Sequence, residues 1–197
     1  MSNSFDHIPV ISQPKELNVN LYQHQLASIY EMEKRENELF VTDGPTHIET
    51  NIGVNADKTG YGKTLSMVTL MMRDKMEWNL DTPYNFTHTV SLAGGRIKKT
   101  TTESYEKVDT TLVLVSQSII TQWYQEILKT PLTVKMVTSR KSIQDVIVEN
   151  YDVILVTPTM YNGLVLKYND YAWKRFIFDE PGHLKVPGMK KIFAGFI

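Results

Sequence analysis

The sequence contains no cysteine, which excludes disulfide bonds and zinc sites with cysteine ligands. It also has no hydrophobic run of the length that crosses a membrane, and its first residues lack the apolar core of a secretion signal. Neither sign of charge prevails, since 21 basic and 22 acidic residues give a net charge of −1. No global positive field therefore attracts nucleic acid, although a single groove can still be basic. These absences favour an intracellular protein without a membrane partner.

The pattern of hydrophobic residues predicts the fold class. A chain of 197 residues, of which 42% are hydrophobic, is long enough for one domain with a sizeable core. Asn20 can cap a first helix, and the 40–50 stretch is expected to be a loop. Strands separated by helices predict an α/β fold with a mostly parallel sheet and helices on both faces. The expected strands are 111–115, 133–137, 153–156 and 175–178, and the helices between them are 118–129, 141–150 and 159–168.

The most specific pattern is the segment Asp57-Lys58-Thr59-Gly60-Tyr61-Gly62-Lys63-Thr64. An apolar run (51–54) precedes it and an amphipathic run (65–78) follows, which predicts a strand, a phosphate-binding loop and a helix. Small residues let backbone N–H groups wrap a phosphate at the positive end of the helix. Lys63 can reach the β and γ oxygens of ATP, and the Thr64 hydroxyl can ligate Mg²⁺. The predicted nucleotide-binding residues are Thr59, Gly60, Tyr61, Gly62, Lys63 and Thr64.

An acidic pair completes this chemistry further along the chain. The expected strand 175–178 ends directly before Asp179 and Glu180. A carboxylate at such a strand end holds Mg²⁺ directly or through water, a role that we assign to Asp179. Glu180 is then the candidate general base that polarises the attacking water. The sequence thus predicts Lys63, Asp179 and Glu180 as catalytic residues, with Thr64 and Asp179 as metal ligands.

Residues 79–110 interrupt the alternation of strands and helices. The segment is polar, with four basic and four acidic side chains. Apolar residues flank Ala93-Gly94-Gly95, which is typical of a β-hairpin turn. We interpret the segment as a hairpin-like insertion, and it is equally compatible with a surface excursion that has no function.

Five segments, in order, resemble the N-terminal RecA-like lobe of superfamily-two helicases and translocases, particularly the Swi/Snf-like branch. That branch has an aspartate at the position of Asp57, where the general phosphate loop has glycine. The segments also resemble helicases of large cytoplasmic DNA viruses, including the poxvirus transcription-factor ATPases. They are 21–25 (glutamine motif), 56–64 (motif I), 112–115 with 118–127 (motif Ia), 152–157 (motif Ib) and 173–180 (the DExx box).

The resemblance implies an ATP-binding lobe that couples hydrolysis to movement on nucleic acid, with DNA favoured over RNA. ATP and Mg²⁺ are the implied cofactors, and Gln25 would hydrogen-bond the adenine base. The implied contacts to nucleic-acid phosphates are Gln117, Ser118, Thr157, Pro158 and Thr159. The last three are also compatible with a plain strand end and helix cap. The viral resemblance implies a location in the cytoplasm or the virion, and without it the nucleus is expected.

Two departures from the family pattern limit these expectations. The acidic box continues with Pro181-Gly182-His183, so its histidine stands one place late and its role is left open. The sequence ends where the third motif of the family is expected, so we expect residues 1–197 to form a first lobe without a second one. The second lobe supplies arginine fingers worth about 10³–10⁵ in rate in related enzymes, so the isolated chain should be nearly inactive.

Two other functions compete with this one. A small-molecule phosphotransferase would need clustered lid arginines, and the arginines of this chain form no cluster in the sequence. A non-catalytic nucleotide-binding or docking module is opposed by the intact set of Lys63, Thr64, Asp179 and Glu180.

Overall fold

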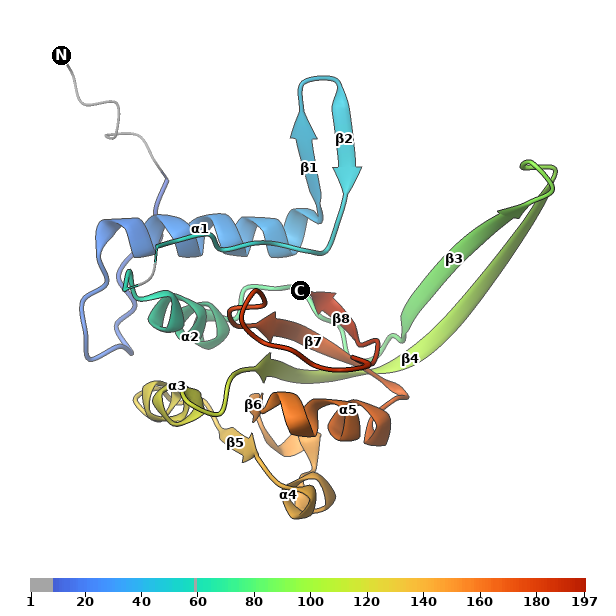
Figure 1. The fold of residues 1–197 in the computed structure, drawn as a ribbon. Helices are drawn as coiled ribbons and strands as arrows, with labels where there is room; N and C mark the ends of the chain where they lie inside the picture. The colour runs from blue at the N-terminus through green and yellow to red at the C-terminus, as the bar shows by residue number, and fades with distance from the viewer. Residues whose placement is uncertain (1–8, 59) are drawn as a thin grey trace.

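The computed structural model describes residues 9–58 and 60–197 and confirms the α/β fold with a mostly parallel sheet (Figure 1). Within the described residues, the main sheet has six strands, of which five follow the order β5-β6-β4-β7-β8 and pair in parallel. The sixth strand, β3, pairs antiparallel with β4. The strands are β3 (Tyr84–Leu92), β4 (Ile97–Leu114), β5 (Val134–Val137), β6 (Val153–Val156), β7 (Tyr171–Phe178) and β8 (Phe193–Phe196).

Helices cover both faces of the sheet, as predicted. Leu112 and Leu114 of β4 pack toward α4 (Arg140–Asp145) and α5 (Pro158–Lys167), in a core that includes Tyr161 and Leu164. Val113 and Val115 pack on the other face, toward α2 (Lys63–Arg73) and α3 (Ile120–Ile127). Because both faces are buried, β4 and β6 show continuous apolar runs instead of alternation.

The first helix lies outside these two layers. The N-terminal α1 (Gln23–Glu38) packs on α2 through a small core of Ile11, Leu21, Ile29 and Leu70. It begins two residues after the expected position, because Tyr22 is its N-cap in place of Asn20. In the part of the chain that the structure describes, no helix combines the length and the hydrophobicity needed to cross a bilayer.

Two sequence predictions were wrong in detail. The expected loop at 40–50 contains the hairpin β1 (Phe40–Asp43) and β2 (Thr46–Glu49), because extended residues flank the Gly44-Pro45 turn. The expected helix 141–150 ends at Asp145 and is followed by a 3₁₀ turn at Val148–Asn150. At this early end the ammonium group of Lys167 satisfies the carbonyls of residues 143, 144 and 146. Val146 and Val148 then turn into the core.

The expected strand before the phosphate loop is also absent from the described elements. Residues 51–54 run as irregular chain that makes two backbone bonds to the other end of the protein. Gly53 N–H donates to the Ile197 carbonyl over 2.7 Å, and Ile197 N–H donates to the Asn51 carbonyl over 2.8 Å. These bonds place residues 51–53 beside the end of β8, and Val54, which is 88% exposed, already points into solvent.

The insertion forms a long hairpin whose second strand continues into the central sheet. We name residues 84–105 the arm, because Figure 1 shows it projecting far from the body of the protein. The predicted boundary at residue 110 is wrong, since Glu106, Lys107 and Val108 already pair with β7. Val108 is buried, and its carbonyl accepts a hydrogen bond from the indole N–H of Trp78. The projecting segment therefore ends before Glu106.

The outer part of the arm should be dispensable for folding. Phe86 and Glu103 lie directly opposite each other, so a two-residue Asn-Gly turn can replace residues 87–102. We expect the melting temperature of this variant to shift by no more than about 4 °C, because all removed side chains are exposed except that of Thr101, which is half-buried. A variant lacking residues 81–108 is measured by the same calorimetry for comparison. We expect this longer deletion to unfold the protein, because it removes three residues of the central sheet. An equal fall in the melting temperature of both variants would show that the outer arm is needed for the stability of the central sheet.

Candidate nucleotide and nucleic-acid site

The phosphate loop is shaped by two glycines. Gly60 and Gly62 have φ angles of +85° and +75°, which residues other than glycine rarely adopt. Gly62 directly precedes α2, so the loop turns sharply into the first helical residue, Lys63. The Lys63 ammonium group donates to the carbonyl of Asp57 over 2.8 Å and so closes the loop on itself. Thr59 lies outside the described residues.

Gln25 lies against this loop instead of facing open solvent. It is 2% exposed, its amide nitrogen donates to the Gly62 carbonyl over 3.3 Å, and its amide oxygen accepts the Tyr22 N–H over 2.9 Å. A methyl group on Gly62 would come within 2.5 Å of the Gln25 amide nitrogen. The glutamine thus fixes α1 to the phosphate loop, and most of its amide is turned away from solvent.

Three aromatic residues lie next to the loop: Tyr61, which was predicted to bind nucleotide, and Tyr22 and His24, which were not predicted as site residues. The rings of Tyr22 and His24 are stacked, 5.7 Å apart and 10° from parallel. His24 also contacts the Tyr61 ring at 5.2 Å and its carbonyl at 3.2 Å. Tyr22 is 72% exposed and Tyr61 is 48% exposed, so both present aromatic surface that can stack on a base.

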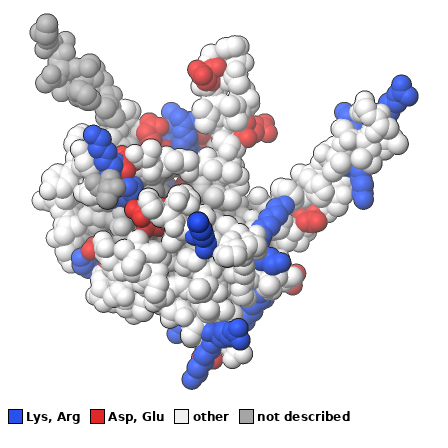
Figure 2. All heavy atoms as spheres, viewed as in Figure 1, with Lys and Arg blue, Asp and Glu red and all other residues white. Residues whose placement is uncertain are grey.

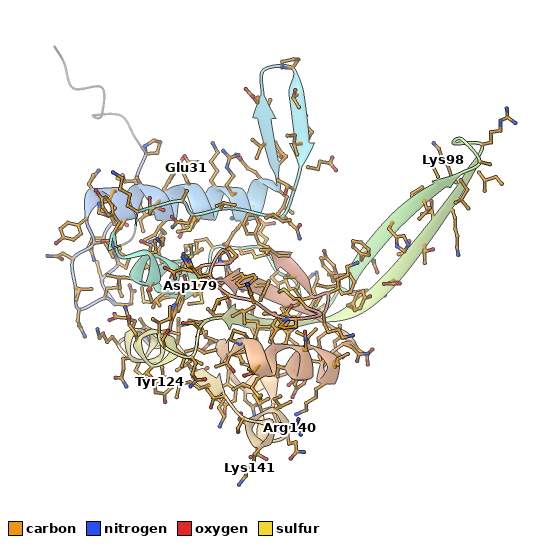
Figure 3. The ribbon with its side chains drawn as sticks, viewed as in Figure 1. Glu31, Lys98, Tyr124, Arg140, Lys141 and Asp179 are labelled. Atoms are coloured by element: carbon orange, nitrogen blue, oxygen red, sulfur yellow. The ribbon has the colours of Figure 1, made fainter. Side chains whose placement is uncertain are left out.

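The acidic pair lies at the carboxyl end of β7, and Figure 3 shows Asp179 between α2 and α3. The indole N–H of Trp123 donates to Asp179 Oδ2 over 2.8 Å and fixes the orientation of the carboxylate. Burial raises the pKa of Asp179, and the neighbouring charge of Glu180 adds to this, while Trp123 and Lys63 oppose it. Glu180 is exposed and has a φ of +50°, an uncommon conformation for a residue with a side chain.

A single open cavity of about 830 Å³ brings the two halves of the site together. Lys63 and Asp57 line it from the phosphate loop, and Asp179 and Glu180 line it from the end of β7. Trp123 also lines this cavity. The structure therefore joins residues that lie more than 100 positions apart in the sequence, at the edge of a parallel sheet where α/β proteins commonly bind ligands.

The residues around this cavity suit Mg²⁺ held together with a nucleotide. The described residues contain no group of three or more His, Cys, Asp or Glu side chains that could hold a metal alone. Mg²⁺ is usually bound by one or two protein oxygens and completed by water and phosphate. The Asp179 carboxylate lines the cavity and supplies an oxygen of this kind. The Thr64 hydroxyl is a second one, on the residue that follows Lys63 in α2, although Thr64 is not among the residues that line the cavity.

The predicted nucleic-acid residues lie side by side at the same edge of the sheet, because β4 and β6 are neighbours that end at Leu114 and Val156. Gln117 and Ser118 follow β4 and are exposed. Thr157 is 1% exposed and caps α5, with its hydroxyl 3.3 Å from that of Thr159. Its side chain is thus structural. Pro158 is half-buried as the first residue of α5, and Thr159 is exposed.

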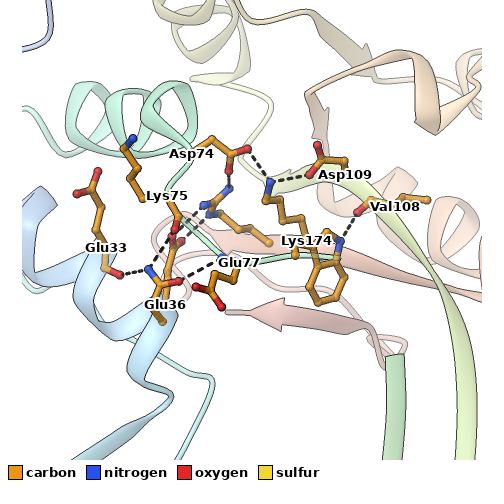
Figure 4. Close-up of polar contacts among 11 residues, drawn as sticks. Glu33, Glu36, Asp74, Lys75, Glu77, Val108, Asp109 and Lys174 are labelled. Atoms are coloured by element: carbon orange, nitrogen blue, oxygen red, sulfur yellow. Dashed lines mark hydrogen bonds and ion pairs between the residues drawn. The ribbon is translucent and has the colours of Figure 1, made fainter. Parts of the chain in front are cut away.

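A network of ion pairs joins four elements (Figure 4), and two of its members, Glu36 and Arg175, are buried and line the same cavity. Arg175 of β7 donates to both carboxylate oxygens of Glu36 on α1, with an Nη2–Oε2 distance of 2.9 Å. It also donates to Asp74, which caps α2, over 2.8 Å. Lys174 bridges Asp74 and Asp109, over 2.6 Å to each. Burial alone would raise the pKa of Asp74, but hydrogen bonds from Lys174 and Arg175 lower it.

Comparison with known proteins identifies the family. Residues 19–194 match the SNF2-related domain. The chain belongs to the SNF2-related family. The family match confirms the Swi/Snf-like part of the predicted resemblance. Among curated proteins, no sequence matches.

A solved structure supports the fold of this SNF2-related chain. It is the Sulfolobus solfataricus SWI2/SNF2 ATPase core in complex with dsDNA, with a TM-score of 0.63 and 18% sequence identity. The match covers 95% of this chain and 33% of that chain. The SNF2-related chain therefore has the fold of an ATPase lobe and spans about a third of the length of that core.

Proposed function

We propose that this chain is the first ATP-binding lobe of a superfamily-two translocase, which couples ATP hydrolysis to movement along DNA. The observation that carries this proposal is the shared cavity of Lys63, Asp179 and Glu180. A phosphate-binding lysine and an acidic pair at the end of a neighbouring strand form the constellation that phosphoryl transfer needs. The SNF2-related family and the dsDNA complex of the similar ATPase core favour DNA as the partner.

Each residue has a distinct role in this proposal. Lys63 exchanges the carbonyl of Asp57 for the β and γ oxygens of ATP, and the glycines let backbone N–H groups approach the phosphates. Thr64 and Asp179 would hold Mg²⁺, which would supply positive charge that neutralises the phosphates. Trp123 holds the Asp179 carboxylate in place. The exposed carboxylate of Glu180 accepts a proton from the attacking water.

The adenine base is proposed to stack on the exposed rings of Tyr22 and Tyr61. Gln25 then acts mainly on the phosphate loop, because both ends of its amide already bind backbone groups. Gln117, Ser118 and Thr159 are proposed to contact DNA phosphates, together with the backbone near Thr157 and Pro158. Such contacts position the lobe on DNA without reading its sequence.

Two finer points belong to the same proposal. The order of the five motif segments also suits the helicases of large cytoplasmic DNA viruses, and we propose an origin of this kind. The location that follows is the cytoplasm or the virion of such a virus, whereas a cellular relative would be expected in the nucleus.

Turnover measurements test the proposal. We expect the chain alone to hydrolyse ATP near the background rate, because a second RecA-like lobe supplies arginine fingers worth about 10³–10⁵ in rate. In a protein that joins this lobe to a second one, duplex DNA should stimulate hydrolysis. There, Glu180→Gln should lower the turnover rate by at least about 100-fold while nucleotide affinity is kept, since only the general base is lost.

A contrary result would point to a different enzyme. Fast hydrolysis or phosphate transfer by the lobe alone, without stimulation by DNA, would contradict the translocase proposal. It would favour the small-molecule phosphotransferase, in which a single domain completes the site.

A further inference from the structure

The outer arm (residues 87–102) concentrates positive charge in a chain that is otherwise acidic. It carries Arg96, Lys98 and Lys99 and no acidic residue. Subtracting these three charges from the net charge of −1 leaves −4 for the rest of the protein. None of the ion pairs among the described residues involves the three. Figure 2 shows basic groups toward the far end of the arm, and Figure 3 places Lys98 near its tip.

The two faces of the outer arm differ in chemistry. One face is a ladder of hydroxyl groups, in which Thr87 pairs with Thr102 and Thr89 with Thr100, each over 2.9 Å. The other face presents Val90, Leu92 and Ile97, which are 46%, 50% and 57% exposed. Cross-strand pairs of this kind stiffen a two-stranded ribbon. The tip therefore combines uncompensated charge with apolar side chains that no other part of the described structure covers.

Aromatic residues at the base of the arm hold it in position. Phe193 of β8 packs against Tyr105 at 4.0 Å and against Phe86 at 5.2 Å between ring centroids. The ammonium group of Lys191 lies 3.6 Å from the centre of the Phe86 ring and 4.3 Å from that of Phe193. The arm is thus anchored to the edge of the sheet and projects as a stiff extension.

The arm is remote from the proposed nucleotide and DNA contacts of the lobe. Its tip lies at the beginning of β4, whereas Gln117 and Ser118 follow the end of this 18-residue strand. At about 3.3 Å per residue, the two ends are roughly 60 Å apart along the strand. The positive tip therefore cannot serve the phosphates of ATP or the contacts at the carboxyl edge of the sheet.

We propose that the outer arm is a second DNA-binding surface that inserts into a groove of duplex DNA. The major groove is about 12 Å wide and admits a two-stranded β-ribbon. Arg96, Lys98 and Lys99 bind phosphates along the groove, and Leu92 and Ile97 pack against sugars and base edges. This inference rests on the proposed function in that DNA is the partner, and it adds a contact outside the motif segments.

The test is the salt dependence of DNA binding by the full chain. Fluorescence anisotropy with a labelled duplex of about 30 base pairs gives the affinity over about 50–200 mM salt. The triple variant Arg96→Ala, Lys98→Ala, Lys99→Ala is expected to bind more weakly, with a log–log salt slope smaller by about 2–3, since each lost phosphate contact removes about 0.9. The matched control removes three exposed lysines elsewhere: Lys15→Ala, Lys34→Ala, Lys75→Ala. Its slope should stay within about one unit of the unmodified chain.

Two further variants separate this proposal from the proposed function. Replacing residues 87–102 by Asn-Gly should weaken binding at least as much as the triple variant, because it also removes Leu92 and Ile97. Ser118→Glu with Thr159→Glu tests the contacts at the carboxyl edge of the sheet. If this pair weakens DNA binding while the arm variants bind normally, the arm proposal is overturned and the proposed function stands. If only the arm variants weaken it, the arm proposal stands and the assignment of the carboxyl-edge contacts is wrong.

The remaining outcomes also decide the matter. Unmodified chain that fails to bind duplex DNA at about 50 mM salt overturns the arm proposal. Polyglutamate of matched charge represents an acidic protein partner and is added as a competitor of the labelled duplex. Displacement of the duplex by polyglutamate as effectively as by unlabelled DNA would overturn the DNA assignment and indicate an acidic protein surface as the partner of the arm.

Discussion

Lys63→Ala is expected to abolish the binding of Mg²⁺–ATP and Mg²⁺–ADP by this lobe, and with it any turnover in a protein that contains a second lobe. Lys63 lines the cavity that Asp179 and Glu180 share, and its ammonium group now binds only a carbonyl of its own loop. A charge-assisted bond is worth about 1.5–3 kcal/mol, and the lysine makes such bonds to two phosphates. The affinity should fall by at least about 100-fold, which isothermal titration calorimetry can measure.

Lys58→Ala is the matched control for this experiment. Lys58 lies in the same loop, is exposed and does not line the cavity. Its removal takes away the same charge close to the same place, so it should change nucleotide affinity by no more than about threefold through long-range electrostatics. Equal affinities for the Lys63→Ala variant and the unmodified chain would show that the loop does not bind phosphate.

The sequence predicted the central layers of this fold well, because they depend on local patterns. Strand 153–156 was predicted with the observed bounds of β6. The predicted strand 111–115 ends one residue later than β4 and does not include the part of β4 that forms the arm. Both are short apolar runs buried on both faces, the pattern typical of parallel strands. The errors occur where distant residues contribute contacts: Lys167 binds carbonyls at the end of α4, and the backbone of Asn51 and Gly53 pairs with Ile197.

In the candidate site, too, local patterns could be predicted from the sequence and contacts between distant residues could not. Lys63, Asp179 and Glu180 could be selected from the sequence because their roles depend on short motifs beside a strand or a helix. Trp123 could not, since its bond to Asp179 joins positions 56 residues apart. Nor did any pattern indicate that Gln25 would bind the Gly62 carbonyl. His24 and Tyr61 become neighbours only when α1 packs on the phosphate loop.

Arg175→Ala is expected to have the largest effect on stability of any single exchange in the ion network. Arg175 is 3% exposed and Glu36 is 2–3% exposed, and the two form a pair with two hydrogen bonds. The variant leaves Glu36 buried without its partner and removes one of the two cations that bind Asp74. Breaking a buried pair from one side costs about 3–5 kcal/mol, which is a large fraction of the stability of an ordinary domain.

Denaturant unfolding of Arg175→Ala, a control variant and a double-mutant cycle measures this effect and its origin. Arg73→Ala is the control, because the Arg73–Glu33 pair also joins α2 to α1 but its side chains are 20% and 13% exposed, so water can partly replace the partner. We expect Arg73→Ala to lower the free energy of unfolding by about 1 kcal/mol. The double variant Glu36→Gln, Arg175→Met should lose less unfolding free energy than Glu36→Gln and Arg175→Met lose together as single variants. The reason is that no unpaired charge remains at these two positions. Additive losses would show that the two side chains act independently. Because α1 also carries Gln25 and β7 leads to Asp179, this buried pair joins the helix that contacts the phosphate loop to the strand that carries the acidic pair.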